Sequence, residues 1–100
     1  ENWMTLGLPD LLICDHNHKF HFVELKYTQF KAVNLSPNQI SWITLHKSAS
    51  VWILVKGQDG LYLYSAEQVI ELKEQGLRLE PIFFCPEPFD WENLFRLILY

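Results

Sequence analysis

The sequence has few cysteines, no long uncharged apolar run and no excess of basic residues. Its two cysteines, Cys14 and Cys85, are far apart in apolar surroundings, which is typical of free buried thiols in a reducing compartment. No apolar run approaches the roughly 20 residues that a membrane-spanning helix needs. No basic-then-apolar leader opens the chain either. We therefore expect an intracellular, cytoplasmic protein that does not act in a membrane.

Basic residues are outnumbered, since eight Lys and Arg against twelve Asp and Glu give a formal net charge of −4. The excess of acidic residues lies in residues 61–100, which hold seven acidic and three basic residues, whereas residues 1–60 hold five of each. A polyanionic partner would therefore bind residues 1–60, and the overall electrostatic field of the protein would attract it only weakly.

What the sequence has in abundance is apolar and aromatic residues, at 49% and 15% of 100 residues. This composition excludes a disordered chain and predicts one densely packed domain over residues 1–100. Apolar periodicity and turn residues predict strands at 8–14, 19–26, 50–56 and 61–64, an edge strand at 82–85, and helices at 37–47, 65–76 and 91–99. The order indicates an α/β fold with a mixed sheet of four to five strands flanked by helices. A Rossmann fold is disfavoured because no Gly-rich turn joins a strand to its helix.

Three charged residues interrupt the first two apolar strands. Asp10 lies in the first strand, and Glu24 and Lys26 project from the same side of the second because side chains alternate with a period of two. Burying a lone charge is costly unless it is paired or bound to a metal. The pattern therefore predicts a functional site on this pair of strands.

These charges form a recognisable motif. Pro9-Asp10, followed after thirteen residues by Glu24-Leu25-Lys26, resembles the motif that names the PD-(D/E)XK nuclease superfamily. With Gly7 ahead of it and Ser36-Pro37-Asn38-Gln39 opening the next helix, the pattern is most similar to VRR-NUC domains and archaeal-type Holliday junction resolvases. The resemblance covers roughly residues 7–56 and the hairpin that follows, and it implies a restriction-endonuclease-like core.

The resemblance implies a metal-dependent DNA endonuclease that uses Mg²⁺ or Mn²⁺ on branched DNA or DNA ends, in recombination, repair or phage genome processing. Asp10 and Glu24 would hold the metal, with the backbone carbonyl of Leu25 as a third ligand. Lys26 would position or help deprotonate the attacking water, and Gln39 would orient the water or the phosphate. Relatives usually add a Glu from a helix before the first strand, and here Glu1 is the only acid ahead of Asp10.

Several residues have a structural as well as a functional interpretation. Asp10 and Lys26 are also consistent with a simple structural ion pair. The spacing of Cys14, His16, His18 and His21 is not typical of a zinc site, so we expect exposed hairpin histidines. His46 could face the site, but such a residue is more often an ordinary surface histidine.

The remaining candidates are aromatic and basic residues outside the motif. Trp52, Tyr62 and Tyr64 could stack on bases, although strand aromatics mostly belong to the core. Lys31 and Lys56 are equally consistent with phosphate contacts and with solvated lysines. The last helix, Trp91–Leu99, is more apolar than one covering face requires, which favours a homodimer over simple closure of the core.

The sequence thus predicts a divalent-metal-dependent deoxyribonuclease. One alternative is a nuclease-like domain that binds DNA or a partner but cleaves poorly, and another is an α/β scaffold that binds no metal. Metal binding through Asp10 and Glu24 would separate the first two from the third, and turnover would separate the first from the second.

Overall fold

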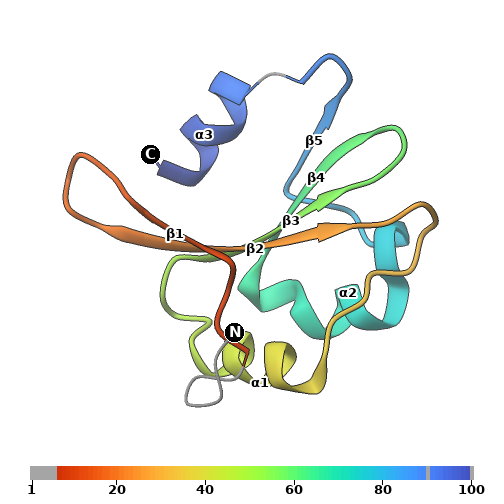
Figure 1. Cartoon of the computed structure of the whole chain (residues 1–100), viewed down its shortest axis with the longest axis horizontal. Coiled ribbons are helices and arrows are strands. Elements are labelled where there is room, and N and C mark those ends of the chain that lie inside the picture. Colours follow the sequence, from red (N-terminus) through yellow and green to blue (C-terminus); the bar gives the residue numbers. More distant parts are fainter. Residues whose placement is uncertain (1–6, 90, 100) are drawn as a thin grey trace.

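The computed structural model describes residues 7–89 and 91–99 of the chain. Five strands form one mixed sheet, three helices cover its two faces, and two short 3₁₀ turns extend the second helix (Figure 1). The strands are β1 (Leu11–Cys14), β2 (Phe20–Tyr27), β3 (Val51–Lys56), β4 (Gly60–Ser65) and β5 (Phe83–Pro86). The helices are α1 (Pro37–Leu45), α2 (Val69–Gln75) and α3 (Trp91–Leu99), with 3₁₀ turns at Ala66–Gln68 and Gly76–Arg78. This is a small α/β domain with the predicted kind of sheet.

The strands lie in the sheet in the same order as in the chain, β1-β2-β3-β4-β5. Only β2 and β3 are parallel, and α1 lies in the connection between them. The other three pairs are antiparallel. Glu24 and Lys26 pair with Ile53 and Val55, so they lie well inside the sheet and not at its edge.

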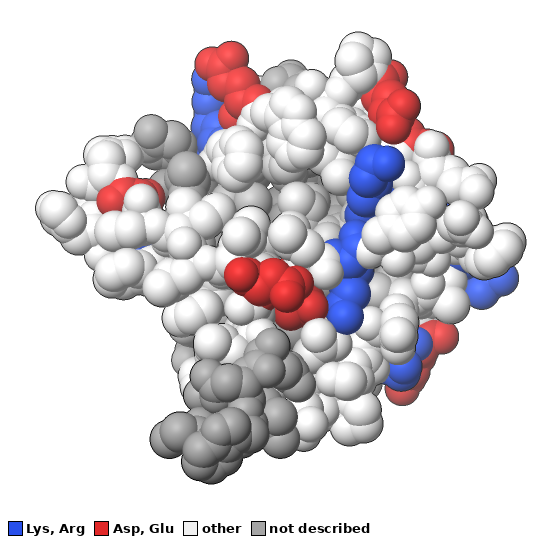
Figure 2. Space-filling model, in the orientation of Figure 1, with Lys and Arg blue, Asp and Glu red and all other residues white. Residues whose placement is uncertain are grey.

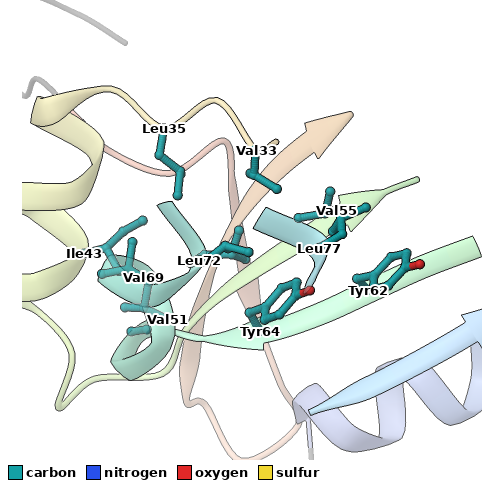
Figure 3. Packing of buried hydrophobic residues seen from close by; sticks show 12 residues of the cluster. Val33, Leu35, Ile43, Val51, Val55, Tyr62, Tyr64, Val69, Leu72 and Leu77 are labelled. Carbon is teal, nitrogen blue, oxygen red and sulfur yellow. The ribbon is translucent and has the colours of Figure 1, made fainter. Parts of the chain in front are cut away.

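Each face of the sheet has its own apolar core, and Figure 3 shows the one beneath α1 and α2. Beneath α1 and α2, the core includes residues from both helices, the loop after β2, and strands β3 and β4: Val33, Leu35, Ile43, Val51, Ile53, Val55, Tyr62, Tyr64, Val69 and Leu72. Beneath α3, on the opposite face, Leu61, Leu63, Cys85, Leu94 and Ile98 pack together. Tyr62 and Tyr64 are therefore core residues, and Trp52 packs against the second core while partly exposed, as expected for strand aromatics.

The first strand differs from the prediction. We expected a buried strand from residue 8, but β1 begins at Leu11 and is an exposed edge strand, with Leu12 57% exposed. The reason is that β1 packs along β2 only, beyond the reach of both helical layers. Cys14 is consequently exposed and not buried, although both cysteines are free as expected and Cys85 is buried.

Helix α3 closes the second core with one side and leaves another side exposed. Leu94 and Ile98 are buried, whereas Trp91 and Phe95 are 49% and 41% exposed. The homodimer that we expected on this helix remains a prediction. None of the helices in the described ranges is long and apolar enough to cross a membrane.

Candidate active site

The side chains of Glu24, Lys26 and Gln39 meet on the α1 side of the sheet. Gln39 donates from Nε2 to Glu24 Oε2 at 3.0 Å and accepts from Lys26 Nζ at Oε1 at 2.9 Å. Lys26 Nζ also lies 3.5 Å from Glu24 Oε2. Since Glu24 and Lys26 are two residues apart on β2, they share this face, as the strand period predicts.

Asp10 approaches the same place from the segment just before the neighbouring strand, β1. It lies at the bend before β1, and its Oδ2 accepts a 3.0 Å hydrogen bond from the backbone N–H of Leu25. This bond replaces the ladder pairing that β1 would make if it began earlier. It fixes the Asp10 carboxylate beside Glu24, so the structure brings all four predicted catalytic residues together.

Glu24 is the most perturbed group of the site. Its side chain is 2% exposed, and this burial together with the nearby Asp10 carboxylate raises its pKa to about 7. Its Oε2 is bonded to Gln39 and lies near Lys26, but Oε1 is buried with no hydrogen-bond partner among the described residues. An uncompensated buried carboxylate oxygen is costly, so the site favours a cation or a proton at this atom.

The start of α1 holds Gln39 in place. Ser36 is the N-cap, its Oγ accepts from Gln39 N at 3.1 Å, and Gln39 Oε1 in turn accepts from Ser36 N at 3.0 Å. This is the capping box that the Ser-Pro-x-Gln sequence predicts. The same Oε1 accepts from Lys26 Nζ, so the residue that closes this helix cap also holds Lys26 in place.

A hollow of about 340 Å³ opens over these groups. Leu8, Asp10, Lys26, Asn34, Ser36 and Gln39 line it. Asn34 was not identified from the sequence, because an Asn in an irregular loop carries no periodic or motif signal. Its position beside Asp10 and Lys26 makes it a polar contact available to a substrate or a bound water.

The residues present fit a hard divalent cation bound by few protein ligands. Glu24 Oε1 and the Asp10 carboxylate provide oxygen donors, which Mg²⁺ and Mn²⁺ prefer. In the described ranges, no three His, Cys, Asp or Glu side chains lie together as a metal-binding group. Protein sites for Mg²⁺ often offer only one or two carboxylates and leave the other positions to water and phosphate. Glu1, the possible additional acid, lies outside the described residues.

The histidines of the β1–β2 hairpin differ in their environments. His16 and His18 are exposed, as expected, but His21 is buried and bonded through Nε2 to Asp15 Oδ2 at 2.9 Å, so the expectation of exposure was wrong for His21. It alternates with Phe22 and Glu24 on β2 and therefore faces the opposite side of the sheet. His46 stacks on the Trp42 ring at 4.0 Å, and its Nδ1 lies 2.7 Å from the carbonyl oxygen of Trp42.

Both lysines proposed for DNA contact are exposed. Lys31 lies in the loop after β2, and Lys56 Nζ lies 5.6 Å from the centre of the Tyr27 ring. On the face in Figure 2, most side chains are uncharged, some basic side chains form a short row, and others lie separately near the rim. The ion pair made by Lys26 is with Glu24, whereas Asp10 bonds to the backbone of Leu25. A simple Asp10–Lys26 pair therefore does not describe the site.

In comparisons with known proteins, no family model matches this chain, and no curated protein or solved structure is significantly similar to it. The motif of Asp10, Glu24 and Lys26 and the geometry around it therefore carry the functional argument.

Proposed function

We propose that this protein is a divalent-metal-dependent deoxyribonuclease of the PD-(D/E)XK kind. The observation that carries the proposal is the buried Glu24 carboxylate, whose Oε1 has no partner among the described residues, with Asp10 and Lys26 beside it. A structural ion pair would leave no oxygen unpaired, whereas a cation site needs one.

Asp10, Glu24 and the backbone carbonyl of Leu25 would hold Mg²⁺ or Mn²⁺. Such an ion supplies a Lewis acid for the phosphate and lowers the pKa of a water molecule. Lys26, 17% exposed at the edge of the hollow, positions the attacking water and offsets negative charge that develops on the phosphate oxygens. Gln39 is a positioning residue in this scheme, because its Oε1 and Nε2 hold Ser36, Lys26 and Glu24.

The resemblance makes branched DNA or DNA ends the proposed substrates, with Lys31 and Lys56 as phosphate contacts. The alternative is a nuclease-like domain that binds DNA or a partner and cleaves poorly. It draws its support from the small number of carboxylates at the site and from the sparse basic residues on the face in Figure 2.

The test is cleavage of labelled linear, flap and four-way DNA in the presence of Mn²⁺. We expect nicking by the wild-type protein and a loss of at least about 100-fold in Asp10→Asn and Lys26→Gln, because removal of one charge-stabilising group costs that much in comparable sites. Lys73→Gln, on the exposed surface of α2, is the matched control and should cut normally.

Circular dichroism should show that all variants fold. Equal cleavage by the wild type, Asp10→Asn and Lys26→Gln would contradict the proposal. Mn²⁺ binding that requires Glu24, without turnover on any of the substrates, would favour the alternative.

A further inference from the structure

A second cavity lies on the opposite face of the sheet, away from the candidate active site. It has a volume of about 380 Å³ and lies between the β1–β2 hairpin loop, the start of β3 and the last turn of α3. Figure 1 shows α3 on the side of the sheet opposite α1 and α2, with its C-terminal end towards this hairpin. We call this space the hairpin cavity. Its volume is within the range of small-molecule sites.

Two side chains in the wall of the hairpin cavity each have a buried nitrogen atom without a hydrogen-bond partner among the described residues. His21 is 4% exposed in its side chain and Trp52 is partly buried, and His21 Nδ1 and Trp52 Nε1 have no hydrogen-bond partner among the described residues. An indole N–H can only donate. Because a buried polar group without a partner is unfavourable, both atoms indicate a ligand or an ordered water at this place.

The acidic residue in the wall of the cavity is tied to the hairpin. Among the described residues Asp15 is the one acid that lines the cavity, and its carboxylate already makes three hydrogen bonds. Oδ1 accepts from the backbone N–H groups of Asn17 and Lys19, at 2.8 and 3.0 Å, and Oδ2 bonds to His21 Nε2. The carboxylate is thus held by groups of the hairpin itself. The Lys19 ammonium and the Trp52 indole N–H are then donors of the wall that remain for a ligand.

The remaining polar groups of the wall add donors and positive charge. Lys19 carries an ammonium group, and Ser50 and Asn17 can each donate a hydrogen bond. Leu97 and Ile98 from α3 form an apolar side. These groups suit a small molecule that has a charged, oxygen-bearing group at one end and a short carbon chain at the other. The cavity is too small to enclose a polymer.

We propose that the hairpin cavity binds a small organic oxyanion, a carboxylate or a phosphate monoester. Lys19 supplies the charge, Trp52 Nε1–H supplies a hydrogen bond, and the α3 side chains contact the carbon body. This site does not depend on the proposed nuclease activity, because Glu24 and Lys26 project from the other face of β2.

The experiment follows the indole N–H of Trp52 in two-dimensional ¹H–¹⁵N NMR spectra of the full chain. Trp52→Phe identifies the resonance, and EDTA prevents phosphate from binding through a metal at the other site. Acetate, methyl phosphate and neutral acetamide are titrated separately, since acetamide has the shape of acetate without its charge. We expect a saturable shift with acetate or methyl phosphate, whichever is the cognate head group, and none with acetamide.

Lys19→Gln should raise the dissociation constant about tenfold, as expected for the loss of one charge-assisted contact. Lys47→Gln, an exposed lysine that does not line the cavity, should leave it unchanged. The proposal is overturned if neither anion gives a saturable shift, if acetamide binds as well as the anions, or if the two lysine variants behave alike. The same spectra show whether each variant is folded.

Discussion

Gln39 is the side chain on which the candidate active site depends most. Its Oε1 accepts from Ser36 N and Lys26 Nζ, and its Nε2 donates to Glu24 Oε2. The resemblance gave Gln39 a role towards water or phosphate, whereas these bonds describe a residue that orders other groups. A neutral amide can accept from a lysine and donate to a carboxylate at the same time, and no charged side chain of this size can do both.

Gln39→Glu tests this arrangement. The change keeps the acceptor of the capping box but replaces the Nε2 donor, 3.0 Å from Glu24 Oε2, with a carboxylate oxygen. Without metal, we expect a lower melting temperature because a third acid then adjoins Glu24 and Asp10. With Mn²⁺, the stabilisation should exceed that of the wild type, since the added oxygen is a further ligand.

Differential scanning fluorimetry with and without Mn²⁺ measures both effects. Gln29→Glu, in the exposed loop after β2, adds the same charge away from Glu24 and is the matched control. Equal Mn²⁺ increments in the wild type and Gln39→Glu would show that no cation binds beside this residue.

Asp15 links stability to pH. Its hydrogen bond with His21, together with the backbone N–H of Lys19, lowers its pKa from 3.8 to about 2. A carboxylate with a lowered folded-state pKa stabilises the fold above its unfolded pKa, and this contribution is lost as the pH falls from about 4 to about 2.

Asp15→Asn should therefore be less stable than the wild type at pH 6, and the difference should shrink between about pH 4 and pH 2. Urea unfolding at several pH values gives this difference directly. Glu67→Gln, which removes an exposed carboxylate from the 3₁₀ turn before α2, should show no comparable trend. A difference for Asp15→Asn that stays constant across this window would contradict the assigned role of the Asp15–His21 bond.

At the scale of elements, the sequence predicted most of the boundaries because their signals are local. The Ser36-Pro37 start of α1, the Gly76 end of the segment that contains α2, and the span of α3 are all confirmed. Gly76 has φ of +62°. The sequence also predicts Asp90 as the cap of the last helix, and this residue lies outside the described residues. Local signals do not show which faces are covered, so the exposure of β1 and the burial of His21 were not predicted. Asn34 could not be placed for the same reason, because only tertiary packing brings it to the hollow.

The segment before β1 is held against the first turn of α1. Gly7 has φ of +88°, and a Cβ at this position would lie 2.1 Å from the backbone oxygen of Asn38. Gly7→Ala should thus cost at least about 1–2 kcal/mol from the left-handed backbone alone. It should also weaken Mn²⁺ binding, because Asp10 follows three residues later and must stay beside Glu24.

Urea unfolding and Mn²⁺ titration measure these two effects. Gly57→Ala is the comparison, since φ is not positive there and the added Cβ would meet mainly side-chain atoms of Leu77 and Tyr62 at 3.1 Å. A smaller loss of stability and unchanged Mn²⁺ affinity are expected for it. If Gly7→Ala binds Mn²⁺ as the wild type does, the close approach to α1 does not position Asp10.

At the scale of the whole molecule, the exposed side of α3 bears on the oligomeric state. Trp91 and Phe95, whose ring centres lie 6.3 Å apart, remain exposed on a helix whose other side closes a core. Exposed apolar side chains that lie together are typical of an interface. We expect a homodimer through α3, with a sedimentation coefficient that falls on dilution.

Phe95→Ser should shift this equilibrium to the monomer without unfolding the chain, because Phe95 is already 41% exposed. Phe30→Ser removes a still more exposed phenylalanine, at 79%, from the loop after β2 and should leave the equilibrium unchanged. Sedimentation velocity at several protein concentrations makes the comparison. A wild type that is monomeric at all concentrations would exclude the dimer.

The order of the strands in the sheet also constrains how the chain reaches this structure. Strands β1 and β2, and strands β3 and β4, form hairpins whose ends are separated by only a few residues, so their loop-closure entropy is small. The parallel β2–β3 pair must instead close the long connection that contains α1. Glu24 and Lys26 lie on β2, at the start of that connection, and Gln39 lies in the connection itself. The groups of the candidate active site therefore come together in the least local step of folding, and the length of the loop after β2 influences both the folding rate and the assembly of the site.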